Sequence, residues 1–153
     1  MDRNQLIETY ERGVDEVLAA VDGLTDDDLD RPATDGGWTA RQVVHHLADS
    51  EMTSAIRLRR LLVEDAPDVG AYDEEAFAAA LAYAERPIAP ALKAFVAARE
   101  TSAQLLRRLD DAQWARAGTH PEHGSYSVAD WLRIYAAHAH DHAEQIRRAV
   151  ARA

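Results

Sequence analysis

Apolar side chains recur every three or four residues over four long stretches of the chain, which is the spacing of helices with one buried face. The first stretch covers about residues 4–21. The second begins after Thr39, a hydroxyl residue suited to cap a helix, and continues to about Glu64. The third covers roughly residues 90–109, and the fourth follows Ser127, a further hydroxyl cap. The pattern therefore predicts four long helices.

Two shorter segments also carry helix signals. Asp73 can cap a short helix over about residues 74–84, which Pro87 would stop. Thr25 opens an acidic turn in which Asp28 stands three residues later, the spacing of a capping box. No run alternates apolar and polar residues for long enough to indicate a strand. We therefore expect an all-α fold, a four-helix bundle with one additional short helix.

The composition limits the kinds of partner. The chain has 153 residues, of which 47% are hydrophobic and 29% charged, as expected for a single globular domain over residues 1–153. A net charge of −10 argues against nucleic acid or an anionic membrane as a partner. No apolar run is long enough for a membrane span, and the start lacks the apolar stretch of a signal peptide, so we expect a cytoplasmic protein. Because there is no cysteine, any metal must be bound by histidine or carboxylate side chains.

Two of the seven histidines lie on the predicted buried face of the last helix. Spacings of three and four residues place five side chains on this face: Trp131, Tyr135, His138, His142 and Ile146. Histidines four residues apart on a helix are close enough to hold one metal ion. Two imidazoles without partners would be costly to bury, which favours a metal over the alternative, a pair of hydrogen-bonded core histidines.

A third ligand has two candidates on the second helix. His45 and His46 are adjacent, so they point about 100° apart and only one can face the core. His46 lies three residues after Val43 and four before Ser50, next to the buried face. If the second and fourth helices are neighbours, His46 can complete the site, although spacing alone favours an ordinary core histidine. Three imidazole ligands that leave coordination positions open to water or substrate are typical of a catalytic zinc site. The type of ligand does not distinguish zinc from nickel, iron, copper or manganese.

Other polar residues near these faces are candidates for supporting roles. We expect His45 and His140 at the surface or flank, and His120 and His123 in a plain loop, with a place at the mouth of the site as the alternative. Tyr135 could donate a hydrogen bond to a bound group, but a core position is the preferred interpretation. The candidates to orient a ligand imidazole or accept a proton are Asp49, Asp141, Glu144 and Gln145. Of these, Asp141 and Glu144 should face solvent.

Two motifs resemble those of the DinB/YfiT-like family of metal-binding four-helix bundles. They are GGWTARQVVHHLADSEM and YAAHAHDHAEQI, at residues 36–52 and 135–146. LRRLLVEDAPDVGAYDEEAF and THPEHGSYSVADWL also look like the YfiT branch, so the resemblance extends from about Leu24 to the end. Bacterial proteins of that branch are described as metal-dependent hydrolases and are related to bacillithiol S-transferases.

The resemblance implies a set of ligands and a class of reaction. The matching positions of the two motifs are His46, His138 and His142, and family members are commonly homodimers that hold zinc or nickel. It therefore implies one divalent metal ion per chain and a homodimer. The implied enzyme would activate a bound water for hydrolysis, or a low-molecular-weight thiol such as bacillithiol for S-transfer, against a small-molecule electrophile. The alternatives are a non-catalytic dimer with a structural metal and a mycothiol-dependent isomerase.

Overall fold

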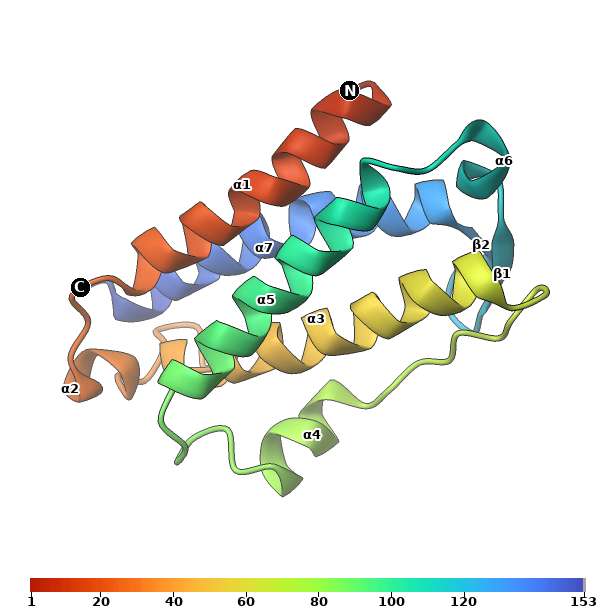
Figure 1. The fold of residues 1–153 in the computed structure, drawn as a ribbon. Coiled ribbons are helices and arrows are strands. Elements are labelled where there is room, and N and C mark those ends of the chain that lie inside the picture. The colour runs from red at the N-terminus through yellow and green to blue at the C-terminus, as the bar shows by residue number, and fades with distance from the viewer. Residues whose placement is uncertain (153) are drawn as a thin grey trace.

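Four long helices form a bundle in the computed structural model, which describes residues 1–152 (Figure 1). They are α1 (Arg3–Val21), α3 (Ala40–Val63), α5 (Ala89–Leu106) and α7 (Val128–Val150). The predicted all-α four-helix bundle is confirmed. Thr39 and Ser127 cap α3 and α7 as expected, each with its hydroxyl accepting a hydrogen bond from the third helical N–H. No helix of the described residues combines the length and the apolar character that a membrane crossing requires.

The connections hold more structure than the single short helix that was expected. Three short helices lie in them: α2 (Asp26–Leu29), α4 (Glu74–Ala80) and α6 (Asp111–Trp114). The capping box predicted at Thr25 is present at the start of α2. The predicted extent of α4 was too long, because Ala82 adopts a left-handed backbone with φ of 52°, which a continuing helix does not allow.

The expectation that the chain has no strands was wrong. Strands β1 (Ala117–His120) and β2 (Gly124–Ser127) pair antiparallel, with Ala117 opposite Ser127 and His120 opposite Gly124. Each strand is only four residues long, which is too short for a period of two to stand out in the sequence. The hairpin leads directly into α7.

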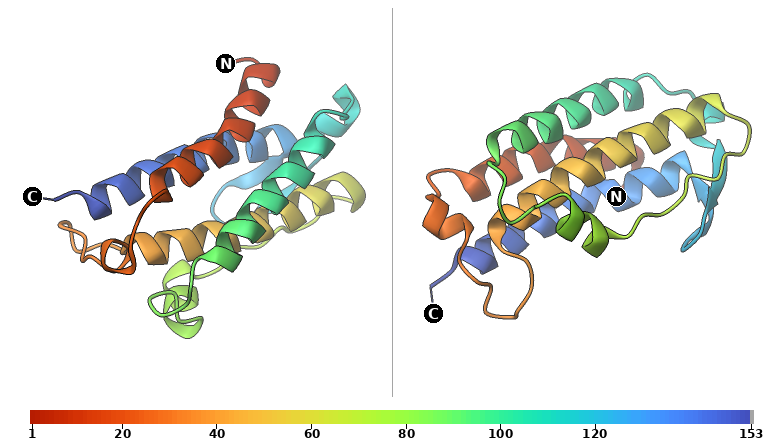
Figure 2. Two further views of the ribbon diagram at one scale, coloured as in Figure 1. Left: turned by 60° about the vertical axis from the view of Figure 1, so that its left-hand side comes forward. Right: turned by 90° about the horizontal axis from the view of Figure 1, so that it is seen from below.

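The order of the long helices around the bundle differs from their order in the sequence. α7 packs against α1 and α3, while α5 packs against α3 and α1. The consecutive pairs α1–α3 and α5–α7 therefore lie across the diagonals of the bundle, and only α3 and α5 are both consecutive and adjacent. The connection between them carries α4 along the outside of α3 (Figure 2). His46 was expected to join His138 and His142 only if the second and fourth long helices are neighbours. Because α3 packs against α7, this condition is met.

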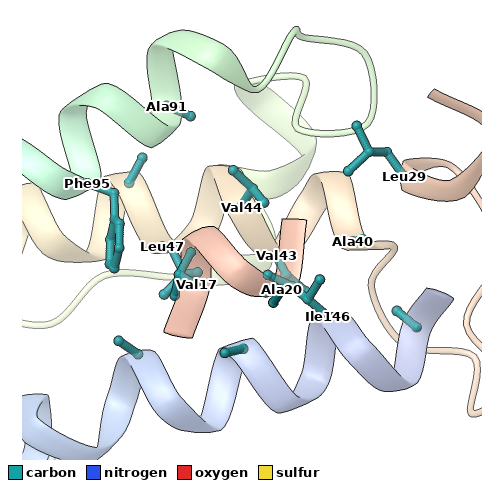
Figure 3. Close-up of a cluster of buried hydrophobic side chains, with 14 residues drawn as sticks. Val17, Ala20, Leu29, Ala40, Val43, Val44, Leu47, Ala91, Phe95 and Ile146 are labelled. Atoms are coloured by element: carbon teal, nitrogen blue, oxygen red, sulfur yellow. The ribbon is translucent and has the colours of Figure 1, made fainter. Parts of the chain in front are cut away.

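Two apolar clusters fill the bundle, one toward each end. The first includes Val17, Val43, Leu47, Phe95 and Ile146, contributed by all four long helices (Figure 3). The second surrounds the largest fully buried side chain, Trp131, and also includes Leu58, Leu61, Leu106 and Leu132. These apolar side chains supply the hydrophobic stabilisation that holds the helices together.

A buried ion pair separates the two clusters. Arg99 donates to Glu51 at 2.8 Å, and both side chains are almost fully excluded from solvent. The hydroxyl of Tyr10 donates to the other carboxylate oxygen of Glu51, also at 2.8 Å. Gly13 allows this packing, because a Cβ there would lie 2.7 Å from Ala139 Cβ and 2.8 Å from Arg99 Nη2. The ion pair thus ties α3 to α5 beside the contact between Gly13 of α1 and Ala139 of α7.

Candidate metal centre

Three histidines from two helices meet between α3 and α7. One ring nitrogen each of His46, His138 and His142 lies within 4.8 Å of the other two. The ring centroid of His46 is 4.7 Å from that of His142 and 5.5 Å from that of His138. The structure therefore brings together the three histidines that the sequence indicated.

The two histidines of α7 lie beside its most buried line rather than on it. His138 and His142 are half-buried, whereas Ala139 and Ala143 are fully buried. The small side chain of Ala139 allows α1 to approach closely, as the contact with Gly13 shows. The buried face of α7 is therefore rotated from the predicted one, and the histidines stand at its edge, where a small molecule can reach them.

Burial keeps the three imidazoles neutral. It lowers the pKa of His46 to about 3, with a further contribution from the nearby His142. Burial also lowers the pKa of His142, and it lowers that of His138 well below the usual value, helped by the other two histidines and Arg99. A neutral imidazole keeps one nitrogen lone pair for a metal ion. All three side chains are therefore in the ligating form at neutral pH.

The hydrogen bonding of the three rings fits a divalent cation. Within the described part of the chain, Nδ1 of His46 and Nδ1 of His138 are buried without a hydrogen-bond partner, an uncommon situation for polar atoms. Nδ1 of His142 lies 2.7 Å from Oε1 of Gln145. Because that oxygen can only accept, Nδ1 carries the proton and Nε2 keeps a free lone pair. Three neutral imidazoles suit zinc or nickel.

Aromatic side chains hold two of the rings in place. Trp38 packs on His46 with ring centroids 5.1 Å apart. Tyr135 meets His138 at 5.4 Å, with the ring planes at 64°. Tyr135 is buried, as expected for a core aromatic, but its hydroxyl also accepts a hydrogen bond from Arg57. The ring positions are therefore fixed by packing before any ligand arrives.

Two clefts border the site, and each is lined by one of the two histidines of α7. The larger, of about 730 Å³, is lined by His142, Gln145 and Trp38 among others. The smaller, of about 460 Å³, is lined by His138 together with other polar side chains. Glu74 and Glu75, at the start of α4, line both clefts. The carboxylates that border the site thus come from a connecting segment that the sequence analysis did not single out.

The four candidates for supporting roles have different surroundings. Gln145 contacts a ligand candidate directly, as described above. Asp49 accepts a hydrogen bond from the hydroxyl of Tyr83 and lines neither cleft. Asp141 and Glu144 are exposed, as expected, and Glu144 pairs with Arg147. Only Gln145 is therefore placed to orient a ligand.

The other histidines lie apart from the three. His45 is buried, contrary to expectation, because the α4–α5 connection covers that side of α3, and its Nε2 lies 2.8 Å from Arg86 O. The half-buried His140 faces α1, with Nε2 2.8 Å from the backbone oxygen of Thr9. His120 and His123 line the smaller cleft. For those two, the alternative interpretation, a place at the mouth of the site, agrees with the structure.

Comparisons with known proteins identify the family of this chain and several relatives. The model of the DinB superfamily matches residues 9–146. "Putative metal-dependent hydrolase YfiT" of Bacillus subtilis (strain 168) is 35% identical over 145 residues, which cover 94% of this chain and 82% of the relative. A protein of Oceanobacillus iheyensis, also named "Putative metal-dependent hydrolase", is 39% identical over 123 residues, 80% of this chain and 71% of the relative.

A solved structure is similar over nearly the whole chain. It is described as "YfiT from Bacillus subtilis is a probable metal-dependent hydrolase with an unusual four-helix bundle topology". The TM-score is 0.87 at 35% sequence identity, and the match covers 94% of this chain and 83% of that chain.

Proposed function

This chain belongs to the DinB superfamily, and on that premise we propose that it is a divalent-metal-dependent enzyme acting on a small molecule. The observation that carries the proposal is the meeting of three neutral imidazoles beside two open clefts. His46, His138 and His142 would hold one zinc or nickel ion per chain. Three protein ligands leave a coordination position for substrate, as in catalytic zinc sites.

The chain's own residues supply orientation, space and proton acceptors. A bound divalent cation supplies Lewis acidity, which lowers the pKa of a water or thiol that reaches it. Gln145 keeps His142 in the tautomer whose Nε2 can bind the ion. Glu74 and Glu75 place carboxylates in both clefts, and burial raises the pKa of Glu74, as do its neighbours Glu122 and Glu75. A carboxylate with a raised pKa is a better proton acceptor near neutral pH.

The reaction that we favour is hydrolysis, the class named for the relatives from Bacillus and Oceanobacillus. The second candidate is the transfer of a low-molecular-weight thiol to a small electrophile. It is supported by the two clefts, because a reaction between two organic partners needs two places beside the ion. With no cysteine in the chain, the nucleophile in either reaction would not be a side-chain thiol.

The first experiment measures the metal content of protein purified without a histidine tag. We expect one ion per chain in the wild type and none in His142→Ala, with the helical circular dichroism signal retained. His140→Ala is the matched control, because His140 lies two residues before His142 but faces α1. The His140→Ala protein should keep the ion. Absence of metal after reconstitution with zinc and nickel, or retention of the ion in His142→Ala, would refute the proposal.

A second measurement separates catalysis from a structural role and hydrolysis from thiol transfer. If the metal is only structural, chelation should abolish the helical signal and no turnover should occur. If the protein is an enzyme, the loaded form should either cleave an activated ester or couple cysteine to an activated aryl chloride, and chelation should stop that turnover. Maleylpyruvate, supplied together with mycothiol, tests the isomerase alternative by product analysis.

A further inference from the structure

The smaller cleft contains a buried arginine with neutral hydrogen-bond partners only. Arg57 of α3 is 7% exposed and lines the cleft that also contains His138. Its Nη2 donates to Gly70 O at 2.7 Å, its Nη1 to the hydroxyl of Tyr135 at 3.2 Å, and its Nε to Val69 O at 3.4 Å. The charge of Arg57 is therefore solvated by two carbonyls and a phenol.

The other buried arginines of the described residues have carboxylate partners. Arg99 pairs with Glu51 at 2.8 Å, and Arg41 pairs with Asp30 at 2.6 Å. Arg57 takes part in no salt bridge within residues 1–152. Burying a guanidinium without a counter-ion is costly. The guanidinium of Arg57 has five N–H groups, and three of them donate to the partners named above. The remaining N–H groups are free to donate to a ligand.

A second donor without a partner lies in the same cleft. The hydroxyl of Tyr72 is buried and has no hydrogen-bond partner among the described residues. Ser50, which is 4% exposed, adds another hydroxyl to the lining. The cleft thus combines a guanidinium that has no salt-bridge partner with an unused O–H donor. Both features are satisfied by an anion.

A carboxylate fits these donors better than a phosphate. Four acidic residues also line the cleft: Asp73, Glu74, Glu75 and Glu122. Their charges disfavour a doubly charged phosphate more strongly than a singly charged carboxylate. The planar fork of a guanidinium also matches the two oxygens of a carboxylate.

We propose that Arg57 and Tyr72 bind the carboxylate of a small organic substrate and so hold its reactive group beside His138. Arg57 contacts the hydroxyl of Tyr135, and His138 contacts the ring of the same tyrosine. The carboxylate and the reacting atom would therefore be separated by about one tyrosine side chain. The position of the reactive group rests on the proposed metal site, whereas the binding of the carboxylate does not.

The test compares two thiols of matching length, one that ends in a carboxylate and one that ends in a neutral hydroxyl group. Calorimetry on zinc-loaded protein measures the affinity for 3-mercaptopropionate and for 3-mercapto-1-propanol, a neutral molecule of matching length. We expect the acid to bind at least about 10-fold more tightly than the alcohol, because a hydrogen bond to a charged group is lost without the carboxylate. Equal affinities for the two would overturn the proposal.

Two variants identify the groups responsible. Tyr72→Phe should weaken binding of the acid about 10-fold, leave the alcohol unchanged and keep the melting temperature, since the hydroxyl has no partner to lose. Arg57→Lys keeps the charge but loses the fork, and it should weaken the acid by more than 10-fold. Arg59→Lys, two residues along α3 and absent from the cleft, is the matched control. Unchanged binding of the acid in Tyr72→Phe and Arg57→Lys would contradict the assignment.

Metal-free protein separates this inference from the proposed function. Propionate and inorganic phosphate are titrated into the metal-free wild type and into Tyr72→Phe. Propionate binding that weakens in the variant supports the carboxylate site even if the chain proves to bind no metal. Tighter binding of phosphate than of propionate would overturn the carboxylate assignment, as would the absence of carboxylate binding in both the metal-free and the zinc-treated protein.

Discussion

Mild acid should destabilise the metal-free protein through the three histidines. A histidine of the unfolded chain has a pKa near 6.5. In the folded protein, burial and the proximity of His142 lower the pKa of His46 to about 3. Between these values the unfolded chain binds the proton and the folded protein does not. The free energy of unfolding therefore falls as the pH falls below about 6.5, and the contribution is fully present only above that pH.

The size of the effect follows from the pKa difference of His46. At pH 5, protonation of the unfolded chain at this residue lowers the free energy of unfolding by about 2 kcal/mol relative to pH 7.5. His138 and His142 act in the same direction, because their pKa values are also lowered. For a chain of 153 residues, about 2 kcal/mol corresponds to a drop in Tm of roughly 4–8 °C. Exposed carboxylates titrate mostly below this range, with ordinary pKa values of about 4.

Thermal unfolding followed by circular dichroism measures this dependence between pH 7.5 and pH 5. His46→Gln should reduce the fall in stability by about 2 kcal/mol, because the substituted side chain no longer takes up a proton in the unfolded chain. His140→Gln replaces a histidine outside the site and serves as the control. The same fall in the wild type and in His46→Gln, or no fall in the wild type, would refute the reasoning.

Two further predictions concern the support of the site and the centre of the bundle. Gln145→Leu removes the acceptor for His142 Nδ1 and should weaken zinc binding roughly 10- to 100-fold in competition with a chelator of known affinity. Unchanged affinity would mean that Gln145 does not orient the ligand. Arg99→Met leaves Glu51 buried without its cation and should lower the free energy of unfolding by about 3–5 kcal/mol in urea titrations. The double variant Arg99→Met/Glu51→Met should recover part of that loss, and a single variant as stable as the wild type would contradict this account.

The long helices and their starts could be predicted because the signals for them are local. Thr39 and Ser127 cap the helices that follow, and both start within one residue of the expected position. The ends were less predictable. α4 stops at Ala80, since the backbone of Ala82 is left-handed, and nothing in the sequence there, such as a glycine, announces that conformation. Signals confined to a few residues thus fix the starts better than the ends.

The site was only partly predictable for a related reason. His138 and His142 are one helical turn apart, so their proximity follows from the sequence alone, whereas His46 depends on which helices are neighbours. Arg57 and Tyr72 were missed, because a buried arginine without a carboxylate is recognised only when all its neighbours are known. The acidic residues over the clefts were missed because they belong to a connection, whose path depends on the rest of the fold.

The diagonal arrangement of the helices has a consequence for the newly made chain. Among the described helices α1 is synthesised first, whereas one of its two main neighbours, α7, is synthesised last. At typical rates of synthesis, the apolar face of α1 stays without this packing partner for on the order of 10 s. His46, on α3, is likewise synthesised before His138 and His142, which belong to α7. The nascent protein therefore cannot assemble the three-histidine site until translation has passed α7, so acquisition of the ion would be among the last steps of its maturation.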